Sequence, residues 1–365
     1  MTMKTRRQFI AETFGATAAF AAATRLSALQ QARARRQVSV GGRRVKTVDM
    51  HAHVAVPDAL IDIVKGSPLE NTVRGQLNGN LVMGDARLKA MDEQGIDVEV
   101  LTVNAYWYAA DRDVAARLIP AQNEALVKAC ASHRDRFVPM ATVALQHPDL
   151  AAEQLEDAVK RLGLRGASIG GHVNGEDLSL PKYDAFWAKA AELGVLVFMH
   201  PGGADNILKE GALRGRGELG NIIGNPLETT YFLSRLIFDG TLDKFPGLKI
   251  CASHAGGYLP SYLGRTEAAC DVRPNANCAN KRRPRDYFKR EITIDTMVFS
   301  DEGLRHLVAE MGVGQIMYGT DIPFNWPVGV DLVLRASFLS DADKEAILGG
   351  NASRLLKLES LKSEV

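Results

Sequence analysis

The sequence has no apolar run long enough to cross a membrane, few cysteines and no excess of basic charge, and each absence narrows the possible classes of protein. A membrane helix needs about 20 consecutive apolar residues, and no stretch of the sequence has this character. The four cysteines lack the paired spacing of a zinc finger. Residues 47–365 carry 34 basic and 42 acidic residues, a balance of −8, which argues against a nucleic-acid-binding face. The 46% hydrophobic content is that of an ordinary folded globular protein.

The first 34 residues differ in composition from the rest of the chain. Residues 5–10 read TRRQFI, a small apolar stretch follows, and QARA ends at Ala34. This order of two arginines, a short apolar region and a small-residue cleavage site resembles a twin-arginine export signal. We therefore expect residues 1–34 to be an export signal, residues 35–44 a basic linker, and the protein to be periplasmic with no other membrane association. The alternatives are a cytoplasmic protein whose first residues form a basic helix, and an uncleaved, anchored form.

Short β-branched segments alternate with longer helical segments from Val45 onward. Eight segments have the pattern of strands: residues 45–50, 98–103, 137–145, 164–170, 195–199, 248–253, 291–296 and 315–320. Several of the helical segments between them end in glycine, the usual helix stop. Eight strand–helix units without a change of composition predict one α/β domain over residues 45–365, a (β/α)8 TIM barrel. The alternative is an open doubly wound sheet, but no Gly-rich phosphate loop follows the first strand.

Three predicted connections are much longer than the usual length of about 2–6 residues. They span residues 54–84, 201–228 and 256–289. Each follows a strand, so all three would rise from the C-terminal face of a barrel, where active sites lie, and would form a lid or the walls of a pocket. The third contains Cys270 and Cys278, which could be bridged in an oxidising compartment.

Histidines and an aspartate stand at the ends of four predicted strands. His51 and His53 are separated by one residue, so on a strand their side chains point to the same side. His200 closes VLVFMH, His254 closes KICASH and Asp321 closes QIMYGTD. The strand ends of a barrel form a ring, which would bring these residues above one cavity. Three imidazoles and a carboxylate suit zinc or a similar divalent ion with an open position for water.

Each of these residues also has an ordinary structural explanation. A single histidine at a strand end is more often a hydrogen-bonded structural residue than a metal ligand. Asp321 could cap the segment that follows it. The coincidence of such residues at four strand ends nevertheless favours a metal site.

The same segments resemble the motifs of a known family. VDMHAHV, MHPGG, SHAGG and GTDIPF resemble motifs of the amidohydrolase superfamily, specifically the amidohydrolase-2 branch, which contains aminocarboxymuconate-semialdehyde decarboxylase. The resemblance extends over residues 45–356. It implies that His51, His53, His200 and Asp321 bind one divalent metal ion, with zinc expected. It also implies that His254 is the catalytic acid/base, acting with Asp321.

The resemblance further implies how substrate is held. Arg74 lies near the position of a family arginine that binds a substrate carboxylate. Arg265, in YLGRTEAA, is similar to an arginine that reaches across a dimer interface into the neighbour's site, so a homodimer is expected. Arginine suits both roles because its planar guanidinium binds a carboxylate through two donors.

Other residues near the expected site have less specific roles. Phe324 keeps an aromatic position after the metal-binding aspartate, next to substrate. His172, in GGHVN, either contacts substrate or satisfies a loop carbonyl. Glu228 is expected to orient His254 by accepting its second N–H, although a carboxylate near a helix N-terminus has a sufficient structural explanation.

The sequence departs from the family pattern at one wall of the expected pocket. Where the decarboxylase has a tryptophan shortly after the fifth-strand histidine, this chain has Gly202 and Gly203. A large ring is therefore missing there, and Trp326 could partly refill the space. The departure leaves the identity of the substrate open.

The sequence thus predicts a metal-dependent decarboxylase of a small unsaturated or aromatic carboxylic acid. The first alternative is a metal-dependent hydrolase of a C–N, ester, lactone or C–C bond, because the same residues could direct hydroxide at a carbonyl group. The second is a periplasmic binding protein without catalysis, against which the retained acid/base histidine argues. The expected partner is a small carboxylate, not a nucleic acid.

Overall fold

The computed structural model describes residues 35–77, 79–327 and 329–358. The predicted export signal, residues 1–34, lies outside these residues. The chain divides into two units, residues 1–36 and 37–365, and the second contains the fold described below. None of the helices in the described part has the length and apolar character of a membrane span.

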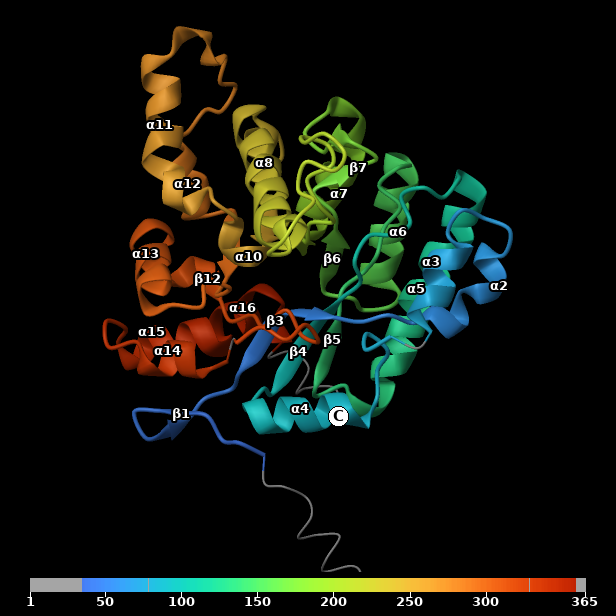
Figure 1. Ribbon diagram of the computed structural model, residues 1–365, viewed down its shortest axis with the longest axis horizontal. Coiled ribbons are helices and arrows are strands. Elements are labelled where there is room, and N and C mark those ends of the chain that lie inside the picture. Colours follow the sequence, from blue (N-terminus) through green and yellow to red (C-terminus); the bar gives the residue numbers. More distant parts are fainter. Residues whose placement is uncertain (1–34, 78, 328, 359–365) are drawn as a thin grey trace, which may run out of the picture. The chain divides into compact units, whose positions relative to one another are not determined.

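Within the described residues, eight parallel strands form the centre of the fold (Figure 1). They are β3 (Val48–His53), β4 (Val98–Thr102), β5 (Phe137–Pro139), β6 (Gly166–Ile169), β9 (Leu196–Met199), β10 (Lys249–Ala252), β11 (Ile292–Asp295) and β12 (Ile316–Met317). β3 to β5 pair in order, and β6 and β9 to β12 pair in a second run. Backbone N–H groups join the two runs, from Ala141 to the Gly166 carbonyl and from Asp321 to the His51 carbonyl, both at 2.8 Å. The strands therefore close into the predicted barrel.

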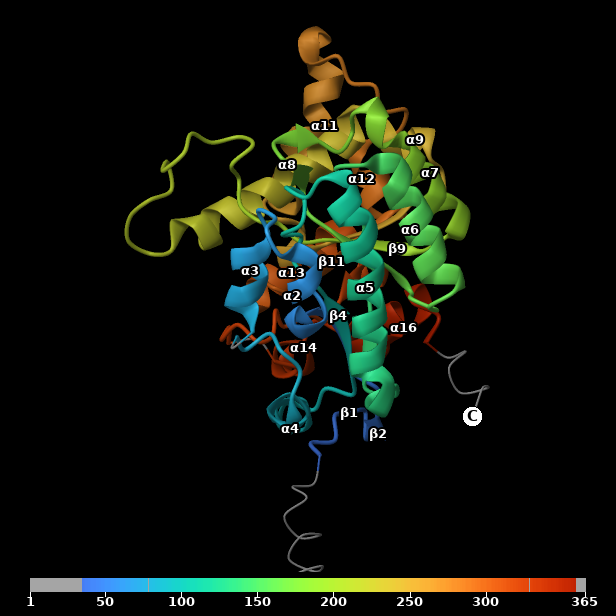
Figure 2. The same ribbon diagram turned by 90° about the vertical axis from the view of Figure 1, so that its right-hand side faces the viewer.

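Helices connect the strands and cover the outside of the barrel (Figures 1 and 2). The main ones are α4 (Asp85–Gln94), α5 (Arg112–Cys130), α6 (Pro148–Lys160), α7 (Asp184–Leu193), α8 (Asn225–Phe238), α9 (Thr241–Lys244), α12 (Pro284–Phe288), α13 (Asp301–Met311), α14 (Asp331–Arg335), α15 (Asp341–Glu345) and α16 (Asn351–Leu355). Short 3-10 or π-helical turns are η2 (Ala131–His133), η3 (Pro181–Tyr183), η7 (Val313–Gln315) and η8 (Ala346–Gly350), and β7 (His172–Val173) pairs with β8 (Glu176–Asp177). Gly95 and Gly194 end α4 and α7 in the left-handed conformation, as the glycine stops predicted.

The three long connections are partly helical rather than simple loops. The first contains η1 (Pro57–Ala59), α2 (Ile61–Val64) and α3 (Glu70–Gln76), and the second contains the π-helical η4 (Gly220–Gly224). The third follows the short α10 (Ser253–Gly256) and contains η5 (Pro260–Tyr262), α11 (Leu263–Val272), η6 (Pro274–Ala276) and α12. α11 projects from the barrel in Figure 1, and a disulfide joins its Cys270 to Cys278.

Residues 39–44, which the sequence indicated as linker, form a hairpin instead. β1 (Ser39–Val40) pairs antiparallel with β2 (Arg43–Arg44). Gly41 and Gly42 have φ values of 55° and 76°, the conformation that a tight two-residue hairpin turn requires. Because Val40 is buried, this part of the expected linker belongs to the folded unit.

A β-bulge in β3 decides which side chains face the barrel interior. Asp49 pairs with Glu99 and Ala52 with Leu101, so β3 uses one residue more than β4. An extra residue breaks the alternation of side chains. Met50 therefore packs in the interior with Phe198, while the ring of His51 lies against the same Phe198 at 5.3 Å. The far end of the interior is closed by apolar residues of the C-terminal segment, Ala352, Leu356 and Leu358.

Candidate metal centre

Four side chains meet at the carboxyl ends of the strands. His51 and His53 come from β3, His200 follows β9 directly, and Asp321 lies four residues after β12. Their ligand atoms all lie within 4.8 Å of one another. Asp321 Oδ1 is 2.9 Å from His53 Nε2 and 3.2 Å from His51 Nε2. The fold thus brings together the four residues that the sequence assigned to a metal.

The cluster is buried, and the ring nitrogens of His200 have no hydrogen-bond partner in the described part of the chain. None of the four residues is more than 7% exposed. Among the described residues, neither ring nitrogen of His200 has a hydrogen-bond partner. Buried polar atoms are normally satisfied, and three imidazoles with a carboxylate are a donor set for divalent cations. The residues therefore fit a divalent metal ion.

The protonation of the cluster agrees with this assignment. Burial lowers the pKa of His53 to about 4 and that of His200 well below its ordinary value, so both are neutral at pH 7, the form that binds metal. Burial also opposes the charged form of His51, but the carboxylates of Asp321 and Asp295 outweigh it and raise the pKa of His51 to about 10. Without a metal, a proton on His51 balances these carboxylates, and a divalent cation would take over that charge.

His254 lies beside the four residues, at the edge of the cluster. Its ring is 5.2 Å from that of His51 and 5.1 Å from that of His200, and its Nε2 is 3.8 Å from Asp321 Oδ2. Its side chain is 14% exposed, against 4% for that of Asp321. His254 can therefore face both the cluster and a bound small molecule, as an acid/base requires.

Two partners of the cluster were missed in the sequence. Asp295, the last residue of β11, accepts a hydrogen bond from His51 Nδ1 at 2.7 Å. Trp326 Nε1 donates to Asp321 Oδ2 at 3.0 Å. The sequence did contain a signal for Asp295, because EITIDT places an aspartate near the end of a predicted strand, as QIMYGTD does for Asp321. The signal for Trp326 was only its nearness to Asp321 in sequence.

The expected hydrogen bond between Glu228 and His254 is not the one that forms. The buried Glu228 carboxylate accepts from the backbone N–H groups of Gly171 at 2.9 Å, Gly202 at 2.9 Å and Gly203 at 2.7 Å. Glu228 lies in the first turn of α8, and the three glycines follow β6 and β9. Glu228 therefore connects the segment that follows β6 with the segment that follows β9, and the second of these begins with His200.

His172 and Phe324, both expected to contact substrate, differ in their surroundings. His172 Nδ1 accepts from the Gly175 backbone N–H at 3.0 Å, and burial lowers the pKa of His172. This bond is to a loop N–H and does not test whether His172 contacts substrate. Phe324 is 43% exposed and its ring lies 5.6 Å from that of His53, so it borders the cluster from the solvent side.

The two arginines assigned to substrate are engaged elsewhere or exposed in the single chain. Arg74 Nε, on α3, pairs with Glu70 Oε1 at 2.9 Å on the same helix. Arg265 is exposed on the projecting helix α11. The positions of Arg74 and Arg265 in the single chain do not test whether they bind a substrate carboxylate.

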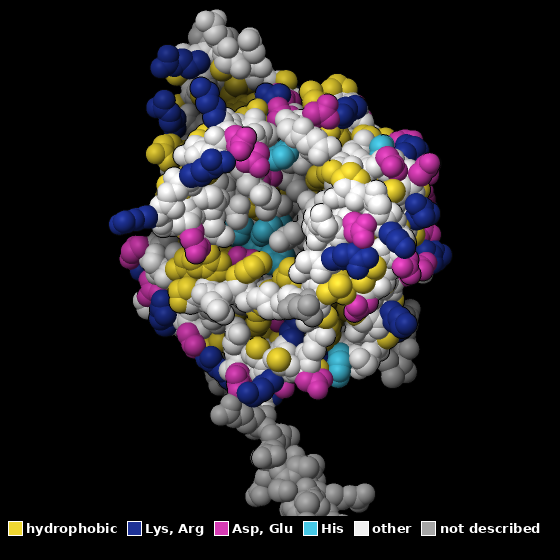
Figure 3. All heavy atoms as spheres, turned by 45° about the vertical axis from the view of Figure 1, so that its right-hand side comes forward, with side chains coloured by type: hydrophobic (Ala, Val, Ile, Leu, Met, Phe, Trp, Pro, Cys, Tyr) yellow, Lys and Arg dark blue, Asp and Glu magenta, His cyan; other side chains and the backbone are white. Residues whose placement is uncertain are grey.

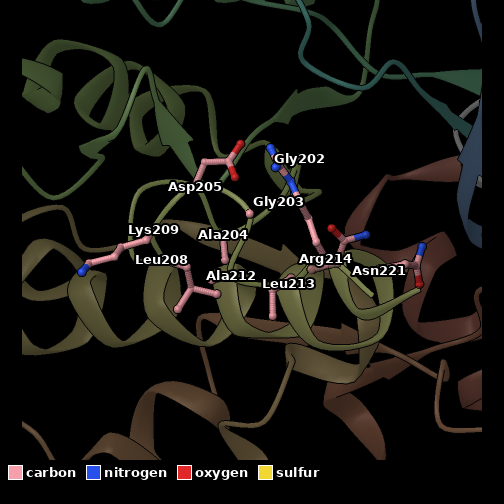
Figure 4. A pocket seen from close by; sticks show the side chains of 13 residues that line it. Gly202, Gly203, Ala204, Asp205, Leu208, Lys209, Ala212, Leu213, Arg214 and Asn221 are labelled. Carbon is pink, nitrogen blue, oxygen red and sulfur yellow. The ribbon is translucent and has the colours of Figure 1, made fainter. Parts of the chain in front are cut away.

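Gly202 and Gly203, which follow His200 in the sequence, line a cavity. Figure 3 shows histidine side chains at the bottom of a hollow. A cavity of about 370 Å³ adjoins Gly202 and Gly203 and is also lined by Lys209, Arg214 and Asn221 (Figure 4). A Cβ on Gly202 would meet no atom within 4 Å, so the missing ring leaves real space. Trp326 does not refill it, because its ring stacks on Phe299 at 5.3 Å.

Comparison with known proteins gives related sequences over almost the whole barrel. A family model described as amidohydrolase matches residues 48–358. Gamma-resorcylate decarboxylase of Rhodococcus jostii (strain RHA1) is 32% identical over 331 residues, which cover 86% of this chain and 98% of the relative. 2-Amino-3-carboxymuconate-6-semialdehyde decarboxylase of Dictyostelium discoideum is 30% identical over 300 residues, covering 79% of this chain and 80% of the relative.

A solved structure also agrees with the fold. The crystal structure of a dihydroxybenzoic acid decarboxylase from Polaromonas sp. JS666, with bound manganese and the inhibitor 2-nitroresorcinol, is 28% identical. It superposes with a TM-score of 0.73 and covers 86% of this chain and 98% of its own. The likeness therefore extends over the complete barrel.

Proposed function

The chain belongs to the amidohydrolase family, and from this membership we propose that it is a metal-dependent carbon–carbon lyase that decarboxylates a small aromatic or unsaturated carboxylic acid. The observation that carries the proposal is the position of His254. It stands beside a buried cluster of three histidines and an aspartate, so a side chain that can transfer a proton lies next to the metal ligands. The relatives named above are decarboxylases.

His51, His53, His200 and Asp321 would hold the metal ion. A bound divalent cation supplies a Lewis acid that attracts and orients the oxygen atoms of a carboxylate substrate. We propose zinc for this chain, because three imidazoles and one carboxylate suit zinc. Manganese is the competing ion, since it is present in the related structure. Elemental analysis of the purified protein distinguishes the two.

The reaction needs a proton at the carbon atom that carries the carboxylate. His254 is placed to deliver it, with Asp321 Oδ2 3.8 Å away as its partner in the relay. A new C–H bond forms as the C–C bond to the carboxylate breaks, and the electron pair of that bond restores the unsaturated system of the product. Carbon dioxide leaves, and His254 regains a proton from solvent. The buried floor around the cluster keeps the charged carboxylate poorly solvated, which favours loss of its charge.

Neither alternative is favoured. A hydrolase would use the same residues, but the relatives reported above act as decarboxylases. A binding protein without catalysis has no need of His254 beside the cluster.

The test is direct measurement of carbon dioxide. Metal-loaded protein is incubated with 2,6-dihydroxybenzoate (gamma-resorcylate), 2-amino-3-carboxymuconate-6-semialdehyde and further hydroxybenzoates, and release of CO₂ is recorded with the decarboxylated product. Protein freed of metal by a chelator serves as the control. Product without CO₂ would support hydrolysis instead, and binding without any product would support the binding protein.

We propose that Arg74 and Arg265 bind the substrate carboxylate, Arg265 from a second copy of the chain. The proposal is supported by the exposure of Arg265 on the projecting helix α11, where a partner subunit can be reached. It requires a homodimer, which sedimentation or light scattering measures. A monomer at working concentrations contradicts it.

We further propose that the chain is exported to the periplasm through the twin-arginine signal in residues 1–34. Support comes from TRRQFI in the sequence and from the bond between Cys270 and Cys278, since disulfides persist in oxidising compartments. Replacing both Arg6 and Arg7 by lysine should leave the protein in the cytoplasmic fraction. Unchanged periplasmic recovery of that variant contradicts the proposal.

A further inference from the structure

Asp295 is the one carboxylate that contacts both the metal cluster and the backbone of the acid/base histidine among the described residues. It is fully buried at the end of β11. Its Oδ2 accepts from His51 Nδ1 at 2.7 Å and from the His254 backbone N–H at 3.0 Å. Its Oδ1 accepts from the backbone N–H groups of Ala255 at 2.7 Å and Met297 at 3.1 Å. Both oxygens therefore face donors only.

The contact with His51 sets which ring nitrogen carries the proton. A carboxylate oxygen accepts and cannot donate, so the proton lies on Nδ1 of His51. In the neutral ring that would bind a metal, the lone pair of Nε2 is then directed at the cluster, where His53 Nε2 lies 3.1 Å away. Such an outer partner fixes the tautomer and orientation of a metal-binding imidazole.

The contacts with His254 and Ala255 hold an unfavourable backbone turn. These residues have φ/ψ values of 54°/48° and 56°/27°, in the left-handed region. Side chains with a Cβ are disfavoured there, and neither residue is glycine. Two of the hydrogen bonds to Asp295 come from the backbone of this turn, which aims the His254 ring at the cluster.

We infer that Asp295 is a positioning residue that places the metal ligand His51 and the acid/base His254 relative to each other through one carboxylate. The part that concerns His254 rests on the proposed function, whereas the part that concerns His51 requires only a metal ion. Asparagine cannot replace the aspartate, because its Nδ2 group would face N–H donors whichever way the amide is turned. If Nδ2 faces His51, the imidazole must present an acceptor at Nδ1, and the proton moves to Nε2, the ligand atom.

The inference is tested with Asp295→Asn and cobalt as the probe. Co²⁺ is bound to the metal-free protein, and its visible d–d absorption and dissociation constant are measured. We expect a changed spectrum, Co²⁺ affinity about 10–100-fold weaker, and a fall in kcat larger than any change in KM. Asp97→Asn is the matched control. Asp97, which directly precedes β4, is also buried, and its carboxylate accepts from the Thr47 backbone N–H at 2.7 Å. This control should keep the spectrum and the affinity for Co²⁺.

A second variant covers the case in which Asp295→Asn does not fold. Glycine adopts positive φ without strain, so Asp295→Asn combined with Ala255→Gly should restore the turn while His51 still lacks its acceptor. The ¹⁵N spectrum of histidines in the intact, zinc-loaded protein adds a measurement without any substitution and should place the His51 proton on Nδ1.

The inference is overturned if Asp295→Asn matches the wild type or Asp97→Asn in Co²⁺ spectrum and affinity, or if His51 carries its proton on Nε2. These readouts do not depend on turnover. If the wild type releases no CO₂ from any substrate but the Co²⁺ results are as expected, the proposed function fails and the positioning of His51 stands.

Discussion

The Nε2 atoms of His51 and His53 lie 3.1 Å apart, on two rings inclined at 78° to each other. Two residues of one strand approach so closely because the bulge in β3 and their i, i+2 spacing turn both rings to the barrel interior. Asp321 Oδ1 lies within 3.2 Å of both nitrogens. Three atoms with lone pairs directed at one point are stable only with a proton or a cation among them. This relationship makes metal binding the first property to measure.

Replacing His200 by alanine should abolish stoichiometric metal binding. His200 has no hydrogen-bond partner for either ring nitrogen in the described structure, so its imidazole contributes little to the fold except as a ligand. Metal content after dialysis is measured by elemental analysis, with His172→Ala as the control because that histidine bonds a loop N–H instead. Retention of a full equivalent of metal by the His200 variant contradicts the ligand assignment.

Replacing His254 by alanine should leave the metal in place and reduce kcat by about 10²–10⁴-fold, the usual contribution of a general acid/base. The reason is its place beside the cluster, 3.8 Å from Asp321 Oδ2. Metal content and the rate of CO₂ release are measured on the same sample. If this variant loses metal as completely as the His200 variant, His254 is itself a ligand.

Replacing Arg265 by alanine should lower kcat/KM by roughly 10–100-fold, the cost of losing charged hydrogen bonds to a carboxylate. Arg305→Ala is the control, as Arg305 is also partly exposed but pairs with Glu302 on α13. Mixing Arg265→Ala with His254→Ala subunits decides whether the arginine acts across the interface. A mixed dimer would contain one complete site and regain activity, whereas an arginine that serves its own chain gives no recovery.

Replacing Cys270 and Cys278 by serine should loosen the projecting segment around α11 without emptying the metal site. The bond closes a loop of eight residues, for which chain entropy alone allows a loss of about 2–3 kcal/mol. Hydrogen exchange of residues 263–283 should rise, and metal content should stay at one equivalent. Exchange that rises equally across the barrel strands would show that the bond supports the whole fold.

The contribution of Glu228 to the stability of the protein should fall as pH rises from about 4.5 to about 7. Burial raises the pKa of Glu228 to about 7, against an ordinary value of 4.5, so in this range the folded state holds a proton that the unfolded chain has released. Each such group lowers the free energy of unfolding by up to about 1.4 kcal/mol per pH unit, and the effect ends above the raised pKa. Asp49, whose pKa burial also raises to about 7, acts in the same direction.

Glu228→Gln should therefore remove this contribution and leave the pH dependence that comes from other groups, among them Asp49, and His53, whose lowered pKa acts in the opposite direction. Unfolding by urea at several pH values measures the slope, and Glu302→Gln, at an exposed position of α13, is the control. A slope unchanged from the wild type in Glu228→Gln would mean that Glu228 is ionised throughout the range.

Much of the site followed from local pattern. The predicted strand 291–296 corresponds to β11 (Ile292–Asp295), and 195–199 corresponds to β9 (Leu196–Met199), because buried strands between helices are short β-branched runs in the sequence. The first strand was predicted to end at Met50 but continues to His53. Its alternation is broken by the bulge, and the last residues are held by partners far along the chain, such as the Ile322 carbonyl.

By itself the sequence determined the order of the strands, the closed barrel and the residues that end the strands, since these depend on periodicity and on the ring that eight parallel strands form. Only the tertiary structure decided which groups those residues bond. Glu228 was expected to serve His254, yet it binds three glycine N–H groups, and Asp295 holds the turn of His254 instead. His51 and its acceptor Asp295 are 244 positions apart. Contacts over such separations are set by strand register and a one-residue bulge, neither of which leaves a mark in the local sequence.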